Sequence, residues 1–277
     1  MWLLETTTLK PQLFLGDSTP YYAILSHTWG SHDKLQNLAG YVKIIRCCAE
    51  AASCGFKYAW VDACCIDKTN SAELSERATE CYVYLVDATD PSGFGNNRWF
   101  TRGWTLQELL APCSVIFFDS DWNEIGTKAS QAEFICHNYV AQRMSWATRR
   151  ETAREEDLAY CLLGIFDISM PMVYGEGRKA FRQLQLEIMK ESTDQSLFAF
   201  SYRLNIGIRP IVCHLLAESP SLFRECGTIQ APGDGPAPEY STTNKGLRIE
   251  LPLAHCIGGF YSAFLNLTRK VCNIREL

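Results

Sequence analysis

Short apolar segments alternate with a helix-like segment in the first half of the chain, and this alternation limits the folds open to it. Residues 22–26, 58–61, 81–86 and 115–118 are apolar runs of strand length. Between the first two runs, apolar residues recur at helical spacing and a glycine follows as a stop: Leu35, Leu38, Val42, Ile45, Ala49, Ala52 and Gly55. Continuous apolar strands that alternate with helices are typical of a parallel sheet with helices on both faces. The sequence therefore predicts an α/β fold.

Polar residues stand where these strands end. Ser26 and His27 close the first strand, and Asp62 follows the second. Ligands of open α/β sheets bind beyond the carboxyl ends of the strands. We therefore expect His27, Asp62, the loop after Val86 and a helix over residues 104–108 to converge on one cleft.

That helix belongs to residues 102–112, where Gly103 opens it and Pro112 ends it. Trp104 and Glu108 are four residues apart, so they project from one helix face. An acid beside an indole on an apolar helix is a candidate for a raised carboxyl pKa and a catalytic role. The alternative is a capping box, Thr105-x-x-Glu108, in which the glutamate only binds a backbone N–H.

The second half predicts more helix and a small β unit. A capping box at 152–155 is expected to open a helix that continues through residue 165, and another helix is expected over 178–191. Residues 175–177 indicate a turn, because the third glycine and the preceding strand of a phosphate loop are missing. Residues 231–238 read as an exposed linker, and residues 247–251 alternate like a half-buried strand.

Composition excludes several classes of function. Hydrophobic residues make up 47% of the 277 residues, which is enough to build a full core. The net charge is −5 and no run of Lys or Arg suggests binding to nucleic acid. No apolar run reaches the roughly 20 residues of a membrane span.

The 13 cysteines predict a reducing compartment rather than a metal site. Adjacent cysteines at 47–48 and 64–65 lie in apolar runs, where they act as small core residues. No Cys-x-x-Cys occurs, and the Cys–His neighbours at 136–137, 213–214 and 255–256 are scattered. The start of the chain has no signal-peptide pattern, so we expect a cytoplasmic protein without a bound metal.

Long phrases of the chain resemble the fungal heterokaryon-incompatibility (HET) domain. The strongest are YAILSHTWG at 22–30, WVDACCIDK at 60–68 and WFTRGWTLQELLAP at 99–112. Further matching phrases lie downstream, at 144–146, 154–157, 162–166, 174–177 and 194–199. The resemblance predicts a HET domain over residues 1–200 and a loop-rich C-terminal extension with short strands over 201–277. Residues 244–252 look like the segment that often follows this domain.

The resemblance implies a fold and a process. HET domains are tied to non-self recognition between fungal hyphae, where they act as effectors of programmed cell death. Their fold is similar to that of TIR domains, a flavodoxin-like parallel sheet flanked by helices. Partners implied by the resemblance are a second copy of the chain or another HET- or STAND-type signalling protein.

The resemblance also implies a site. Many TIR domains cleave the nicotinamide–ribose bond of NAD with a glutamate in a Trp-x-x-x-Glu-Leu phrase, which residues 104–109 match. Glu108 would then be the catalytic carboxylate, and NAD a substrate rather than a permanently bound cofactor. Substrate-binding roles fall to residues at strand ends or near the carboxylate: Ser26, His27, Trp29, Asp62 and Trp104.

Structural roles remain open for these residues. The tryptophans can be core fillers, Ser26 and Asp62 can cap the elements that follow them, and His27 can be a buried imidazole with its hydrogen bonds satisfied. Ser26 and His27 are not a nucleophile–base pair, because neighbours on a strand point to opposite faces.

Two segments are shorter than in the family, at 77–80 and 129–140, each by about one helix of roughly 11–12 residues. Loss of the first helix would uncover a sheet face, so a degenerate copy is one alternative. A second is a non-enzymatic module that signals by homotypic assembly. A third is a metal or thiol enzyme built on the cysteines.

Overall fold

The computed structural model describes a little over two thirds of the chain: residues 1–15, 18–28, 38–65, 78–88, 97–128, 139–200, 215–230, 240–243, 246–250, 252–255, 261–263 and 267–269. These form two compact units, Met1–Cys136 and His137–Leu277. Trp29, the linker at 231–238 and residues 129–138 of the second shortened segment lie outside the described residues, whereas residues 78–80 of the first shortened segment belong to a strand. The domain boundary expected at residue 200 stays a prediction.

The first unit is built on a seven-stranded sheet. Its strands, in spatial order, are β2 (Pro11–Leu13), β1 (Trp2–Glu5), β4 (Tyr58–Val61), β3 (Tyr22–His27), β5 (Ala78–Tyr84), β6 (Ser114–Phe118) and β7 (Glu124–Thr127). The four central strands, from β4 to β6, run parallel. β1, β2 and β7 are antiparallel additions at the two edges. The predicted α/β sheet is confirmed, while the strand β7 was not predicted.

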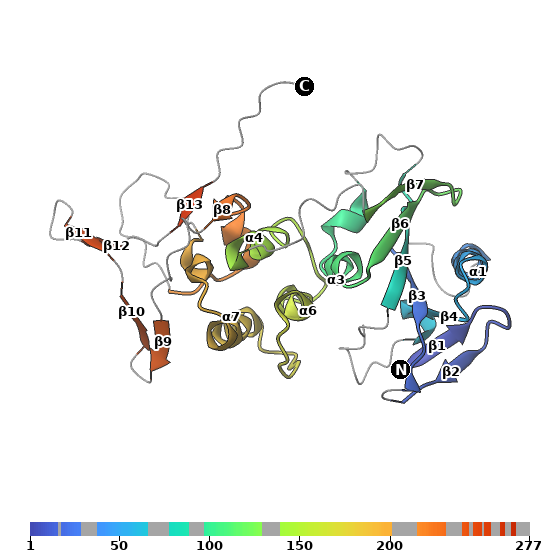
Figure 1. Ribbon diagram of the computed structural model, residues 1–277, viewed down its shortest axis with the longest axis horizontal. Coiled ribbons are helices and arrows are strands. Elements are labelled where there is room, and N and C mark those ends of the chain that lie inside the picture. The colour runs from blue at the N-terminus through green and yellow to red at the C-terminus, as the bar shows by residue number, and fades with distance from the viewer. Residues whose placement is uncertain are drawn as a thin grey trace, which may run out of the picture. The chain divides into compact units, whose positions relative to one another are not determined.

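Helices cover both faces of this sheet. Figure 1 shows α1 (Leu38–Ser53) and α3 (Thr105–Leu110) on opposite sides of the strands. The short helix α2 (Asp62–Cys65) follows β4 directly. The short helix η3 (Arg98–Thr101) directly precedes α3. In chain order the parallel strands lie 2-1-3-4, so the order reverses between β3 and β5. A flavodoxin-like sheet has this reversal, and its ligands bind there. The closer likeness to TIR domains stays a prediction.

The core explains why these segments form these elements. β3 is buried along its whole length, as the apolar residues 22–25 predict, and its polar end at Ser26 and His27 is buried as well. The predicted helix is present as α1, but its buried face is not the predicted one. Ile44, Cys47, Cys48 and Ala51 are buried, whereas Val42, Ile45, Ala49 and Ala52 of the predicted apolar series are exposed. Each large side chain buried in this way contributes about 1.5–3 kcal/mol.

The second cysteine pair corrects one expectation. Cys65 is buried, but Cys64 is exposed, so the prediction that both are core residues is wrong for Cys64. Both residues belong to α2, where neighbours point about 100° apart around the helix axis. On this short helix Cys65 faces the core and Cys64 faces solvent.

The second unit is mostly helical. Its helices are α4 (Val140–Ser145), α5 (Asp157–Tyr160), α6 (Leu163–Phe166), α7 (Lys179–Glu191), η5 (Gln195–Phe198) and η6 (Pro220–Phe223). Three two-stranded sheets accompany them: β9 (Tyr240–Thr243) with β10 (Gly246–Ile249), β11 (Leu253–His255) with β12 (Tyr261–Ala263), and β8 (Ile229–Gln230) with β13 (Thr268–Arg269). The predicted helix at 178–191 and the strand near 247–251 are confirmed. None of the helices in the described ranges has the length and apolar character needed to cross a membrane.

One helix prediction for this unit is wrong. The Thr152 hydroxyl donates to the carbonyl of Arg154 at 2.6 Å instead of capping a helix. The expected helix is also broken into α5 and α6, with Cys161 and Leu162 between them. Burial of Cys161 and Leu162 in the core holds the chain in this interrupted path, so tertiary packing outweighs the local helical preference.

The turn expected at 175–177 is present and is held by a carboxylate. Glu156 Oε1 accepts from the backbone N–H of Gly175 at 2.7 Å and of Gly177 at 3.0 Å. Both glycines have positive φ, a conformation that disfavours residues with a Cβ. These bonds to Gly177 and Gly175 lower the pKa of Glu156.

We predict that this carboxylate makes stability depend on pH. Because the folded-state pKa is lowered, the stabilisation is complete above the unfolded pKa of about 4.3 and is lost as the pH falls through the folded value. Glu156→Gln should therefore lose less stability than the wild type between about pH 5 and pH 3. Urea unfolding at each pH measures this, with the exposed Glu191→Gln as control. Equal pH profiles for wild type and Glu156→Gln would contradict it.

A second prediction concerns Gly55, which ends α1 with φ +85° and has no atom within 4 Å of a Cβ built on it. Gly55→Ala should destabilise the first unit by about 1 kcal/mol through backbone strain alone. Gly126 has equally open surroundings without a positive φ. Gly126→Ala should therefore be neutral within about 0.5 kcal/mol in the same urea titration. Equal effects of the two substitutions would show that φ is not the cause.

Candidate functional site

The candidate site lies at the carboxyl edge of the parallel strands. β3 ends with Ser26 and His27, next to the reversal of strand order between β3 and β5. Asp62 follows β4 directly as the first residue of α2. α3, which carries Glu108, contacts β3. Ser26, His27, Asp62 and Glu108 are thus gathered at one edge of the sheet.

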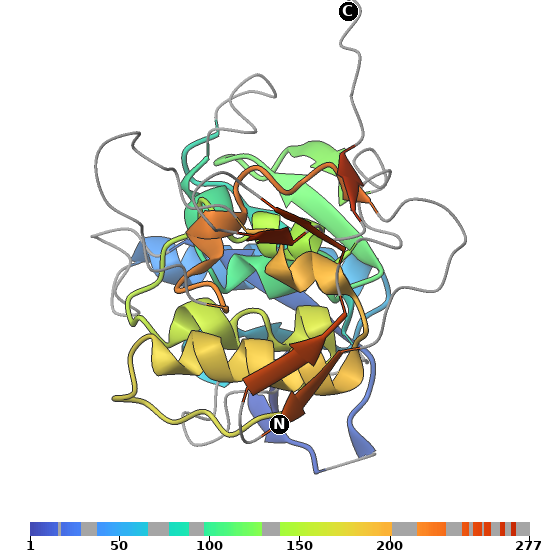
Figure 2. The same ribbon diagram turned by 90° about the vertical axis from the view of Figure 1, so that its left-hand side faces the viewer.

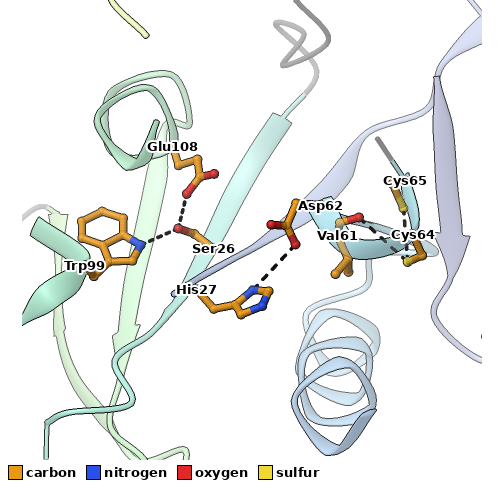
Figure 3. Close-up of polar contacts among 8 residues, drawn as sticks. All are labelled: Ser26, His27, Val61, Asp62, Cys64, Cys65, Trp99 and Glu108. Atoms are coloured by element: carbon orange, nitrogen blue, oxygen red, sulfur yellow. Dashed lines mark hydrogen bonds and ion pairs between the residues drawn. The ribbon is translucent and has the colours of Figure 1, made fainter. Parts of the chain in front are cut away.

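Glu108 takes part in a chain of hydrogen bonds through Ser26. Trp99 Nε1 donates to Ser26 Oγ at 2.6 Å, and Ser26 Oγ donates to Glu108 Oε2 (Figure 3). Because an indole N–H can only donate, the serine oxygen must accept from it and direct its single proton to the glutamate. The arrangement thereby makes Glu108 Oε2 a hydrogen-bond acceptor.

Burial makes this chain of bonds rigid. Trp99 is completely buried and Ser26 is 1% exposed, while Glu108 is half-buried. The Trp99 ring packs edge-on against Phe117 of β6, with ring centroids 5.9 Å apart. The hydroxyl that contacts Glu108 is therefore fixed by the core rather than by solvent.

The structure rejects the capping-box alternative for Glu108. The helix α3 has Trp104 at its N-cap position, and no side chain caps it. The Thr105 hydroxyl donates to the carbonyls of Trp99 at 2.7 Å and of Arg102 at 2.9 Å. Since the Glu108 carboxylate contacts Ser26 of β3 instead, its position follows from tertiary structure.

Sequence reasoning missed Trp99 as a site residue and favoured Trp104. Trp104 is half-buried at the start of α3, and Trp99 is the indole that is bonded to Ser26. Both lie in the family-like phrase at 99–112, but helical spacing pointed only to Trp104. A buried tryptophan needs a partner for its N–H, and this requirement was the available signal.

His27 and Asp62 form a second pair. His27 Nδ1 lies 4.0 Å from Asp62 Oδ1, which is beyond hydrogen-bond distance. The His27 side chain is 5% exposed and that of Asp62 27%. In Figure 3, His27 and Ser26 point in different directions, as expected for neighbours on a strand. The structure therefore separates the predicted residues into two pairs, Ser26 with Glu108 and His27 with Asp62.

Two thiols lie beside the second pair. Cys64 Sγ is 3.8 Å from Cys65 Sγ and 3.9 Å from the carbonyl oxygen of Val61 (Figure 3). The hydrogen bond from Cys65 lowers the pKa of Cys64, whereas the same bond and burial raise that of Cys65. Cys64 is thus the more acidic thiol of the pair. Across the described ranges, no group of three or more His, Cys, Asp or Glu residues could hold a metal ion.

Comparison with known proteins finds similarity to one curated protein, the vegetative incompatibility protein HET-E-1 of Podospora anserina. The chain is 41% identical to it over 222 residues, which cover 62% of this chain and 16% of that protein. The chain thus spans about a sixth of that protein's length. No protein-family model and no solved structure matches the chain.

We predict that Ser26 and Trp99 are energetically coupled. Ser26→Ala should cost about 1–3 kcal/mol, because it leaves the buried indole N–H of Trp99 without its acceptor. Trp99→Phe removes that N–H, so the double variant should cost about 1 kcal/mol less than the sum of the two single variants. Urea unfolding of the four proteins completes the cycle. Strict additivity would show that the bond contributes nothing.

Proposed function

We propose that the chain takes part in vegetative incompatibility and that its first unit hydrolyses the nicotinamide–ribose bond of NAD. Similarity to the Podospora incompatibility protein supports the process. One observation carries the proposed activity: Glu108 is held by Ser26 at the edge of the sheet where strand order reverses. That edge is where α/β sheets of this kind bind nucleotides.

The proposed reaction needs one well-placed carboxylate. The bond between ribose C1′ and the nicotinamide nitrogen breaks, and its electron pair leaves with neutral nicotinamide. The ribosyl group then carries positive charge, which the Glu108 carboxylate stabilises as in glycosidases. Water adds at C1′ and releases its proton, so the products are ADP-ribose, nicotinamide and a proton.

The hydrogen-bond chain supplies the required orientation. Ser26 engages one carboxylate oxygen of Glu108, and the other oxygen points away from Ser26 in Figure 3. A carboxylate that a buried hydrogen bond already orients needs little reorganisation to act on a substrate. Asp62, 27% exposed at the adjacent strand end, is the proposed partner of ribose hydroxyls.

A second candidate function is non-enzymatic signalling by homotypic assembly. The observation that favours it is the surface of α1, where Tyr41, Val42 and Ile45 are 50%, 44% and 39% exposed. Large apolar side chains grouped on one helix surface are a common feature of protein interfaces. Under this alternative, a charge at Val42 abolishes signalling and loss of the Glu108 carboxylate has no effect.

NAD turnover by purified, concentrated protein tests the enzymatic proposal. The wild type should release nicotinamide, and Glu108→Gln should reduce the rate by about 10²-fold or more, because it keeps the shape and removes the charge. Glu124→Gln is the matched control, since Glu124 is an exposed glutamate of β7 in the same unit. Circular dichroism verifies folding. Wild-type rates in a folded Glu108→Gln protein, or no turnover by the folded wild type, would refute the proposal.

A further inference from the structure

A cavity in the second unit is not used by the proposed reaction. Its volume is about 490 Å³, and its walls come from α7, the segment Leu215–Glu218 and the β9–β10 hairpin. Figure 2 shows this hairpin lying across α7. Ligand pockets typically enclose about 300–1,000 Å³, so this one is large enough for a small molecule.

Buried hydrogen bonds fix two walls of the cavity. The side-chain amide of Gln185, fully buried on α7, donates to the carbonyl of Ala217 and accepts from its N–H, both at 2.9 Å. The Tyr240 hydroxyl of β9 donates to the carbonyl of Ser192 just after α7. The Tyr240 ring also packs edge-on against Phe198, with centroids 5.3 Å apart. The cavity is therefore preformed by the fold.

The wall formed by α7 changes in character along the helix. The residues of α7 that line the cavity are Lys179, Arg182, Leu186 and Met189, spaced so that they lie on one helix face. The two cations are exposed near the amino end, Leu186 is half-buried, and Met189 is buried near the carboxyl end. At 1.5 Å per residue, this gradient extends about 15 Å.

The opposite walls carry both apolar and charged side chains. Leu216 and Leu247 add apolar surface, and Glu218 adds the one acidic group. Arg178 binds Glu218 at 3.7 Å and Glu155 at 2.8 Å, so it offsets that charge. Among the residues that the structure describes, neither Lys179 nor Arg182 forms an ion pair. The mouth of the cavity therefore carries an excess of positive charge over an apolar interior.

We propose that this cavity binds a single-chain amphiphile with an anionic head group. The carboxylate or phosphate head lies between Lys179 and Arg182, and the aliphatic chain lies along Leu186 and Met189. Charge complementarity selects the head, and burial of apolar surface selects the chain. This inference does not depend on NAD hydrolysis, because every residue involved belongs to the second unit.

Calorimetric titration of the full chain tests the proposal with decanoate as the probe. Decanoate should bind at one saturable site, decanol more weakly, and acetate not detectably. Added salt should weaken the binding of decanoate and leave the binding of decanol unchanged, because only decanoate has a charged head group. Decyl phosphate and vesicles of phosphatidylglycerol distinguish a free amphiphile from a membrane surface, and the proposal requires binding of the free amphiphile.

Two variants distinguish recognition of the head group from recognition of the aliphatic chain. Arg182→Glu should weaken the binding of decanoate about tenfold and leave the binding of decanol unchanged. Leu186→Gln should weaken decanoate and decanol alike. The control is Arg149→Glu, the same charge reversal at an exposed arginine of this unit outside the cavity. It should bind decanoate as the wild type does, and thermal unfolding verifies that all variants are folded.

Three results would overturn the proposal. The first is the absence of saturable decanoate binding to the wild type. The second is equal loss of decanoate binding in Arg182→Glu and Arg149→Glu, which would indicate a diffuse charge effect. The third is binding to vesicles alone, which would assign the basic residues to a membrane surface instead of a cavity.

Discussion

The position of the candidate site depends on one hydroxyl group. Ser26 accepts a hydrogen bond from the indole of Trp99 and donates one to Glu108, although these residues are 73 and 82 positions away from Ser26 in the sequence. The polarity of this chain of bonds is fixed at one end, because the indole N–H can only donate. It therefore fixes a carboxylate on a short helix against the end of a buried strand. A surface helix of this length would not hold the group by its own stability.

The location of this interaction in the sheet makes it relevant to function. The same Ser26–Glu108 contact elsewhere would be an ordinary buried hydrogen bond, but here it stands where strand order reverses. Next to it, His27 and Asp62 approach without bonding, and Asp62 stays partly exposed. The first pair thus joins a buried hydroxyl to a half-buried carboxylate, and the second pair places a partly exposed carboxylate at the adjacent strand end. Both pairs are the groups on which the proposed NAD hydrolysis relies.

The two units divide charged and apolar surface in different ways. The first unit places a half-buried carboxylate at the edge of its sheet, and the second surrounds a cavity with cations at one end of α7. Reciprocal bonds of Gln185 to the segment at 217 keep that cavity open. The proposed amphiphile site and the proposed hydrolytic site can therefore be tested independently of each other.

The sequence by itself determined the central strands, the helices α1 and α7, and the gathering of Ser26, Asp62 and Glu108 at one edge. Strand ends and the presence of a helical segment are local properties, so they can be predicted without coordinates, whereas the buried face of α1 was set by the tertiary structure. Only the tertiary structure decided what Glu108 and Thr105 bind, which indole belongs to the site, and where the helix after Thr152 breaks. In each case a local interaction, such as a helix cap, competes with an interaction to residues far away in the sequence. The packing of the whole core decides which of the two forms, and a short stretch of sequence does not contain the distant residues.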